Sequence, residues 1–234
     1  MSDTSYTYLG LTNKVLIELN EVTIDDTADF NSAVGFHEAV KGYVNDAIES
    51  IYYEEDNEWP FQKFQDTVTT LTNGTTDYTL NVDSADVDWD SFYIQRNDLL
   101  PIPQPAKKLP LHQYEDYRDW YRSDDMNRNP ESYTSPDFVV RLPDNKIAIS
   151  PPANQAYTLV YNYFRVFTPL VNPSDVPLIP LRYKRAIIEY AKALAYDFRD
   201  NEESSAQAES RAEKIVNKMR RDLIPQQDTV VAIC

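Results

Sequence analysis

The chain has 234 residues, a net charge of −16 and a hydrophobic content of 42%. Its length allows one large or two small domains, and its apolar content is sufficient for a folded core. Proteins that grip nucleic acid by counterion release need a basic surface, so this acidic chain is not an ordinary DNA-binding protein. No apolar run reaches the roughly 20 residues that span a bilayer. The N-terminus lacks the basic start and apolar core of a secretion signal, so we expect folding in a cytoplasm.

The residues that usually support catalysis or metal binding are scarce. Cys234 is the single cysteine, and His37 and His112 lie in different segments, so neither an internal disulfide nor a zinc site is expected. The chain has no phosphate-binding glycine loop and no nucleophile elbow. The adjacent carboxylates Glu54/Glu55 and Asp124/Asp125 would be candidates for glycoside hydrolysis. Such pairs in polar loops are usually a solvated surface, and we predict no enzyme site and no cofactor.

The N-terminal part of the chain has helical periodicity. Residues 7–20 place Tyr8, Leu11 and Val15 on one face, and residues 21–31 are polar and predict a loop. Residues 33–53 carry the widest apolar stripe in the chain. Its members are Phe36, Val40, Tyr43, Val44, Ala47, Ile48, Ile51 and Tyr52.

The middle of the chain favours β-strands. Threonine-rich residues 67–72, then Asn73-Gly74, then residues 75–82 predict a β-hairpin, because Asn-Gly is the strongest two-residue hairpin signal. Further strands are expected at 89–95, 137–141, 146–150 and 156–167, with a short aromatic helix at 111–121.

The C-terminal part returns to helical periodicity. In residues 181–198 the repeat predicts an apolar face of Tyr183, Ile187, Tyr190, Leu194 and Phe198. Residues 199–202 predict a break, and the helix that follows it and ends at Pro225 repeats the pattern with Ala208, Ala212, Ile215, Met219 and Leu223. Ser204 and Ser205 are its candidate N-caps.

The two helical parts are natural partners, since an isolated pair of helices leaves its apolar faces exposed. The predicted fold class is therefore α+β. An antiparallel helical bundle forms from residues 1–61 and 170–224, an antiparallel β-sandwich or barrel-like domain of residues 62–169 is inserted between them, and residues 225–234 form an extended C-terminal arm.

The residues leave several interpretations open. The apolar tail is either a frayed end or an arm that adds to a neighbouring chain. Lys107, Lys108, Arg118 and Arg122 would suit an anion, although their acidic surroundings favour a solvated face. An alternative function is a carbohydrate-binding or polysaccharide-hydrolysing tail component, with Trp120 and Tyr121 of the β domain as stacking residues.

Four segments in this order carry a family resemblance. They are Tyr8 to Leu16, Phe36 to Ile51, Trp59-Pro60-Phe61 before the β-rich part, and Ser174 to Tyr183 before the last helices. The set resembles the head-to-tail adaptor proteins of short-tailed bacteriophages (podoviruses), also called tail tubular protein A.

The resemblance implies a structural virion protein and not an enzyme. It implies a ring, usually of twelve copies, that joins the portal protein to the tail nozzle protein and lines the channel through which double-stranded DNA passes without specific binding. Tail fibres are a further partner that the resemblance allows, and no membrane is involved. The expected location is the head-tail interface of the virion, after assembly in the host cytoplasm.

The resemblance also implies which residues meet a partner. In such families the last helix and tail contact the portal, which here gives Lys214, Lys218, Arg220, Arg221, Leu223, Val230, Val231 and Ile233. An acidic channel would let DNA slide by offering its phosphates no grip. The acidic loops that we expect to line it contain Asp25, Asp26, Glu54, Glu55 and Asp56.

Overall fold

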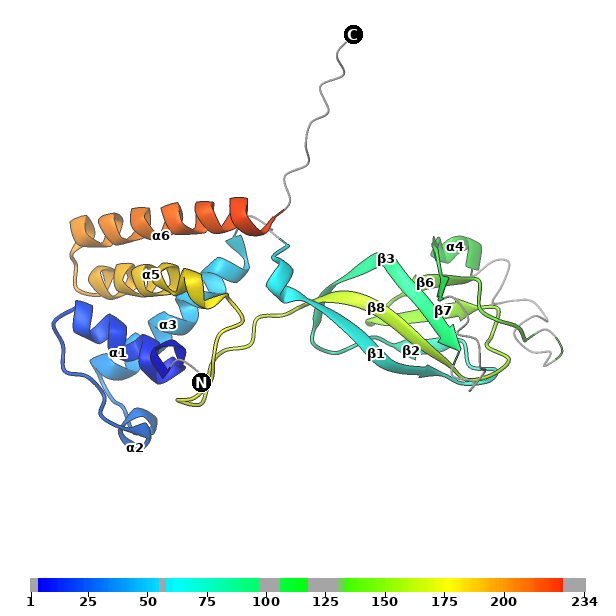
Figure 1. Ribbon diagram of the computed structural model, residues 1–234, viewed down its shortest axis with the longest axis horizontal. Coiled ribbons are helices and arrows are strands. Elements are labelled where there is room, and N and C mark those ends of the chain that lie inside the picture. The colour runs from blue at the N-terminus through cyan, green and yellow to red at the C-terminus, as the bar shows by residue number, and fades with distance from the viewer. Residues whose placement is uncertain (1–3, 55–57, 97–105, 118–130, 132, 225–234) are drawn as a thin grey trace, which may run out of the picture. The chain divides into compact units, whose positions relative to one another are not determined.

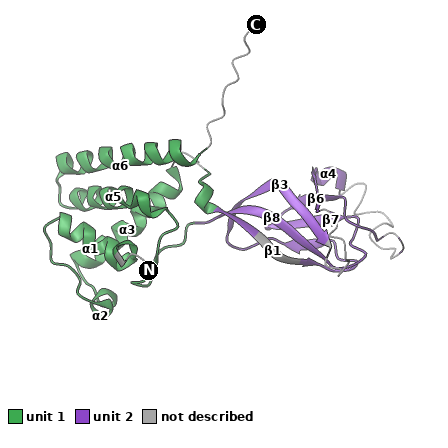
Figure 2. Ribbon diagram, in the orientation of Figure 1, with its two compact units in different colours: residues 1–62, 167–234 green, residues 63–166 purple. Residues whose placement is uncertain are grey.

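The computed structural model describes residues 4–54, 58–96, 106–117, 131 and 133–224. The chain divides into two compact units (Figure 2). Residues 1–62 and 167–234 form the helical unit, and residues 63–166 form the β unit. The expected mixture of helices with largely antiparallel sheets is confirmed. None of the described helices is long and apolar enough to cross a membrane.

The helical unit is built from both ends of the chain (Figure 1). Its N-terminal half holds α1 (Tyr8–Glu18), α2 (Thr27–Asn31) and α3 (Phe36–Tyr52), and its C-terminal half holds α5 (Lys184–Asp197) and α6 (Glu202–Leu223). Helix α5 is central, because it contacts α1, α3 and α6. Short 3-10 turns occur at Thr4–Tyr6, Pro60–Gln62 and Leu181–Tyr183.

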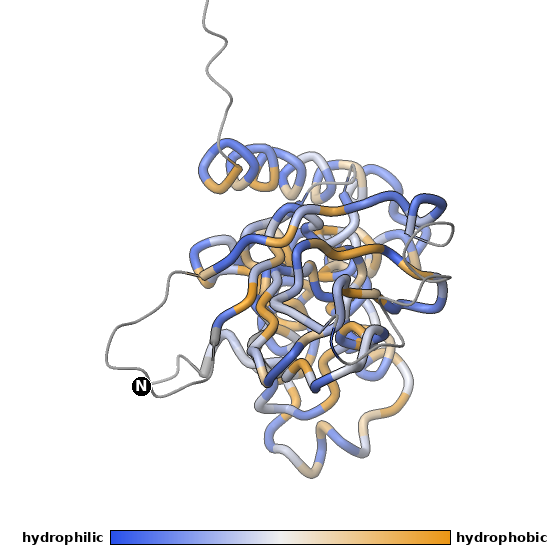
Figure 3. The backbone as a smooth tube through the Cα atoms, turned by 90° about the vertical axis from the view of Figure 1, so that its right-hand side faces the viewer, coloured by the Kyte–Doolittle hydropathy of each residue, from blue (hydrophilic) through white to orange (hydrophobic). Residues whose placement is uncertain are grey.

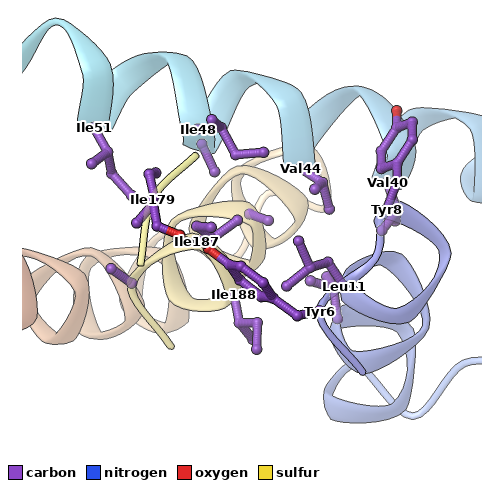
Figure 4. Packing of buried hydrophobic residues seen from close by; sticks show 14 of the residues in the cluster. Tyr6, Tyr8, Leu11, Val40, Val44, Ile48, Ile51, Ile179, Ile187 and Ile188 are labelled. Atoms are coloured by element: carbon purple, nitrogen blue, oxygen red, sulfur yellow. Dashed lines mark hydrogen bonds between the residues drawn. The ribbon is translucent and has the colours of Figure 1, made fainter. Parts of the chain in front are cut away.

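The core of this unit joins residues that are far apart in sequence (Figure 4). Val44, Ile48 and Ile51 project from α3 toward Ile187 of α5, and all four are buried. The buried Tyr6 hydroxyl donates a hydrogen bond to the carbonyl of Ile179, which ties the N-terminus to the segment before α5. The apolar stripe predicted for residues 33–53 is thereby confirmed.

Three expectations for the helices were wrong. Residues 27–31 form α2, where a loop was expected, because Asp26 caps its first turn by accepting hydrogen bonds from the amides of Ala28 and Asp29. The cap of α6 is Asn201, which accepts from the amide of Ser204, and not Ser204 or Ser205. Phe198 is 64% exposed, although the periodicity had placed it on the buried face of α5.

The buried face of α5 consists mainly of small residues. Ala186, Ala191 and Ala195 are fully buried beside Ile187 and Ile188. Small side chains allow α3 and α6 to approach α5 closely, and this rotates the large aromatic residues toward the rim. In Figure 3 the coil of α6, at the top of the view, is hydrophilic on its upper side and carries its hydrophobic positions on its lower side. The buried residues of α6 are Ala208, Ala212, Val216 and Met219.

The β unit contains two four-stranded sheets that share one core. The first has the order β1 (Lys63–Leu71), β8 (Tyr157–Arg165), β3 (Ser84–Arg96) and β4 (Lys107–Lys108), with antiparallel neighbours. The second has the order β2 (Asp77–Thr79), β7 (Lys146–Ser150), β6 (Phe138–Leu142) and β5 (Leu111–His112). Its β5–β6 pair is parallel. Phe92 stacks on Tyr161 at 5.0 Å between ring centroids.

The predicted hairpin at Asn73-Gly74 is wrong. The turn forms, with Gly74 at φ +76°, but β1 pairs with β8 and β2 pairs with β7, so the two strands enter different sheets. The amide of Gly74 donates to the carbonyl of Ala153 at 3.0 Å. Turn chemistry is local, whereas strand pairing is decided by which apolar faces meet in the core.

The aromatic helix predicted over residues 111–121 is also wrong in its extent. Leu111–His112 is strand β5, and helix α4 covers Tyr114–Asp116. Residues 118–121 of the predicted helix lie outside the described residues. The side chain of Tyr117 is buried with Phe138 and Val140. Residues 100–105 and most of residues 124–136 lie outside the described residues.

Candidate functional site

Some of the α6 residues that the resemblance assigns to the portal contact are exposed, and others pack within the helical unit. Lys214, Lys218 and Arg221 are exposed. Leu223 instead packs against the core of the helical unit, and Arg220 lies close to Glu54 of the segment after α3. The remaining members, Val230, Val231 and Ile233, lie outside the described residues.

Arg220 was predicted to contact the portal, and Glu54 was predicted to line the channel. Their charged groups lie 3.5 Å apart, and both side chains are mostly covered, with exposed fractions of 29% and 21%. The pair joins the C-terminal end of α3 to the last turns of α6. A carboxylate paired in this way offers less repulsion to a phosphate than a free carboxylate does.

The other acidic residues proposed for a channel lie in two loops. Asp26 is exposed but serves as the cap of α2, and Asp25 is exposed beside it. Glu55 and Asp56 lie outside the described residues. Asp25 and Asp26 thus belong to the part of the helical unit that holds α2, while Glu54 belongs to the α3–α6 contact. Their place in a channel remains a prediction.

A groove of about 460 Å³ runs between α3, α5 and α6. Its charged residues are all acidic: Glu54, Asp197 and Glu209. Ala193 and Leu194 form its apolar floor, and the remaining lining residues are Ser50, Tyr190 and Ser205. This surface therefore suits a cationic group better than a phosphate or a nucleic acid.

Two tyrosines report the electrostatics of this region. Burial raises the pKa of Tyr190 to about 12, and the nearby Glu54, Glu213 and Glu209 add to the effect. Burial also raises the pKa of Tyr43, with further contributions from Asp46 and Asp197. Both hydroxyls stay neutral at physiological pH, so the acidic residues give this side of the unit its charge.

A buried ion network joins α1 to α5. Glu189 and Lys192 are 1% and 6% exposed, and the ammonium of Lys192 lies 3.3 Å from the Glu189 carboxylate and 2.9 Å from that of Glu18. Arg185 pairs with both carboxylates. The network was not predicted from the sequence, because Arg185, Glu189 and Lys192 fall outside the apolar face expected for residues 181–198. Their spacing of three and four residues, interleaved with buried alanines, is the signal that could have indicated it.

An aromatic patch surrounds the turn between α5 and α6. Phe198 lies 6.2 Å from Phe36 and 6.3 Å from Tyr43, measured between ring centroids. The guanidinium of Arg199 lies 4.1 Å from the ring of Phe36 and pairs with Glu21 at 2.6 Å. Phe198 is exposed, and Phe36 and Tyr43 are half-buried. Aromatic residues at a surface beside an arginine are typical of protein–protein contacts.

The β unit offers one further hollow, with a volume of about 430 Å³. Trp89 and Arg141 line it, and the guanidinium lies 5.4 Å from the indole centroid. Lys107, one of the candidate anion contacts, pairs with Asp137 at 2.5 Å, and Lys108 is exposed. The other residues considered for anions, glycans or hydrolysis in this part of the chain lie outside the described residues: Arg118, Trp120, Tyr121, Arg122, Asp124 and Asp125.

The side chains that the structure describes do not assemble a metal site. No group of three or more histidine, cysteine, aspartate or glutamate residues is arranged to hold a metal ion in this part of the chain. The described surface carries an acidic groove, an aromatic patch and a charged outer helix.

Comparison with known families identifies the family of the chain. A model of the SU10 adaptor protein family matches residues 6–231, which include both halves of the helical unit and the whole β unit. The chain belongs to the SU10 adaptor protein family. It is a phage head-to-tail adaptor, as its resemblance to that class had indicated. A search of curated proteins found no match.

Membership in the SU10 adaptor family sets the class of function. It supports a structural, non-enzymatic role, contact with other head and tail proteins of a phage, and a location in the virion. The exposed surfaces of the helical unit are therefore better read as contact surfaces than as remnants of an active site.

Proposed function

We propose that this adaptor forms a ring, of twelve copies by analogy with the head-to-tail adaptors it resembles, between the portal and the tail nozzle of a short-tailed phage. The observation that carries the proposal is the match of the SU10 adaptor family across residues 6–231. We further propose that the helical unit is a bundle that builds the ring and that the two sheets of the β unit form a sandwich, since each unit has its own core. DNA would pass through the ring during ejection.

The proposed portal contact is the segment 225–234 with Val230, Val231 and Ile233, together with the neighbouring exposed Arg221. An apolar segment that orders on binding loses its conformational entropy only when the partner is present. Attachment would then wait for the portal. The proposed channel lining keeps Asp25 and Asp26, which are exposed acidic residues.

The test is native mass spectrometry of the purified adaptor, alone and after mixing with the portal ring of the same phage. We expect the adaptor to join the portal in a defined multiple. Deletion of residues 226–234 should weaken attachment at least tenfold and leave thermal unfolding unchanged. Normal attachment of the truncated chain would contradict the proposed portal contact of the tail. If the full chain does not attach at any salt concentration, the proposed function is wrong.

The carbohydrate alternative predicts different results. Host-surface glycans should then bind the purified protein, or be cleaved by it, and replacement of Glu54, Glu55, Asp124 or Asp125 should abolish cleavage. The adaptor proposal expects neither binding nor cleavage.

A further inference from the structure

Helix α6 carries a basic stripe on its exposed surface. Arg211, Lys214 and Lys218 are spaced by three and four residues, and all three are exposed. With 3.6 residues per turn they fall within roughly 60° around the helix axis. The shallow hollow beside this stripe has a volume of about 410 Å³ and is lined by Ala206, Ser210, Arg211 and Lys214, together with Glu203 and Gln207 at its N-terminal end. Another protein surface can therefore approach the helix closely here.

An acidic wall follows the other exposed side of the same helix. Glu209 lines the groove between α3, α5 and α6 together with Asp197, and Glu213 lies four residues further along α6. Because residues four apart on a helix lie on the same side, Glu213 shares the groove side of α6 with Glu209. Both carboxylates also raise the pKa of Tyr190. Glu209 and Glu213 lie roughly 150° around the axis from the basic stripe. We call Asp197, Glu209 and Glu213 the acidic wall.

Neither charged surface is neutralised by an ion pair within the part of the chain that the structure describes. Among the described residues, the ion pairs of the helical unit include no member of the basic stripe and no member of the acidic wall. The nearest pair on α6, Arg220 with Glu54, lies at the end of the groove. One helix thus presents opposite unpaired charge on two sides of a strongly acidic molecule.

We propose that the basic stripe of one copy binds the acidic wall of the next copy. The occupant of the groove is then a second copy of this chain, because the same molecule supplies the complementary charge at the same helix. A contact that uses two different surfaces of each copy repeats head to tail and closes into a ring when the rotation allows. The inference rests on the proposed ring. It assigns Lys214 and Lys218 to a contact between copies, in place of the portal contact that the resemblance implies.

The chemistry of the contact follows from the lining of the groove. Long arginine and lysine side chains can lay their methylene groups along Ala193 and Leu194 while their charged ends reach Asp197 and Glu209. Since these charges lie near the surface, salt screens the attraction, and assembly should weaken as ionic strength rises.

The test uses two reciprocal variants of the full chain. Variant one is Arg211→Glu with Lys214→Glu, and variant two is Glu209→Lys with Glu213→Lys. All the introduced residues are good helix formers, so both chains should fold. The readout is the number of adaptor copies on each portal ring, by native mass spectrometry. We expect each variant alone to attach at least tenfold fewer copies than the wild type, because like charges then face each other.

An equimolar mixture of the two variants is the decisive arm. The positive stripe of variant two then meets the negative groove of variant one, and the reverse contact also pairs opposite charges. We expect the wild-type copy number, with the two masses present in equal numbers. Lys108→Glu with Lys146→Glu, at exposed positions of the β unit, is the control, because it changes the net charge of −16 to −20 as variant one does.

The possible results separate the inference from the proposed function. If the wild type attaches and each variant alone attaches equally well, the contact between copies is wrong and the adaptor function stands. If both variants are folded and fail, and the mixture also fails, the contact between copies is wrong. If the wild type itself does not attach, the proposed function fails first.

Discussion

The ammonium group of Lys192 lies 2.9 Å from a carboxylate oxygen of Glu18, which links the middle of α5 to the end of α1. The two residues are separated by 174 positions in sequence. Removal of one partner leaves a buried charge without compensation, which is more costly than the loss of a surface pair. We therefore expect a single substitution in this network to lower the free energy of unfolding strongly.

Replacing Lys192→Met should lower the free energy of unfolding by about 3 kcal/mol, because Glu189 stays buried with less compensation. Urea denaturation at pH 7 measures this change. The matched control is Lys14→Met, since Lys14 is half exposed and lies 3.8 Å from Glu18. The control should change the free energy by less than about 1 kcal/mol. Equal small losses in both variants would contradict the prediction.

The same network makes stability depend on pH. Burial alone would raise the pKa of Glu18, but hydrogen bonds from Lys192 and Arg185 outweigh it and lower the pKa below 4.5. A folded-state pKa below the unfolded value gives stability that is present above the unfolded pKa and is lost as the pH falls through the folded pKa. Glu18→Gln should therefore destabilise most at pH 7.

Urea denaturation of the wild type and Glu18→Gln at pH 7, 5 and 3.5 checks this dependence. The difference in free energy of unfolding should narrow as the pH falls below 4.5, the ordinary glutamate value. A difference that is the same at all three pH values would show that the substitution acts through packing and not through charge.

Two glycines should respond to alanine in opposite directions. Gly42 lies within α3, and a Cβ there would meet nothing within 4 Å, so Gly42→Ala should stabilise the protein by about 0.5–1 kcal/mol. Gly74 has φ +76°, and its Cβ would lie 2.8 Å from the Tyr133 ring. Gly74→Ala should destabilise by about 1 kcal/mol or more. Thermal unfolding of each variant gives the signs, and equal signs would contradict this pair.

Asn45 of α3 forms hydrogen bonds that hold the segment after the β unit, at Leu170, against the helix. Its side-chain oxygen accepts from the amide of Leu170 at 2.9 Å, and its amide group donates to the Leu170 carbonyl and to the Tyr8 hydroxyl at 3.1 Å each. Asn45→Asp cannot donate, so it should cost about 1–3 kcal/mol. Urea denaturation measures the loss, with exposed Asn217→Asp on α6 as the control. A loss equal to the control would mean that these hydrogen bonds are dispensable.

The sequence predicted the helices best where large apolar residues carried the pattern. In α3 every fourth or third residue is bulky, and Val40, Val44, Ile48 and Ile51 are indeed buried. In α5 the large residues misled, because close helix packing needs alanine at the contact and leaves Phe198 at the rim. When helices pack closely, the positions of the large apolar residues therefore do not have to coincide with the buried positions.

The candidate site was less predictable than the fold. The spacing of Lys214 and Lys218 was visible, but the position of Arg220 against Glu54 depends on how α3 and α6 meet, which no local pattern contains. The network of Glu18, Arg185, Glu189 and Lys192 was missed for the same reason. A pattern of apolar residues does not indicate buried charged residues, whereas pairing across helices allows them to be buried.

The core of the helical unit is built from both ends of the chain, and this sets the order in which the two units can fold during synthesis. Helices α1 and α3 are made first, yet their buried faces are completed by α5, which begins at Lys184. At bacterial rates of synthesis the ribosome needs on the order of ten seconds to go from the end of α3 to the end of α5. The β unit is complete within that interval and has its own core. We therefore expect the β unit to fold before the helical unit, because α1 and α3 complete their core only after α5 has been synthesised.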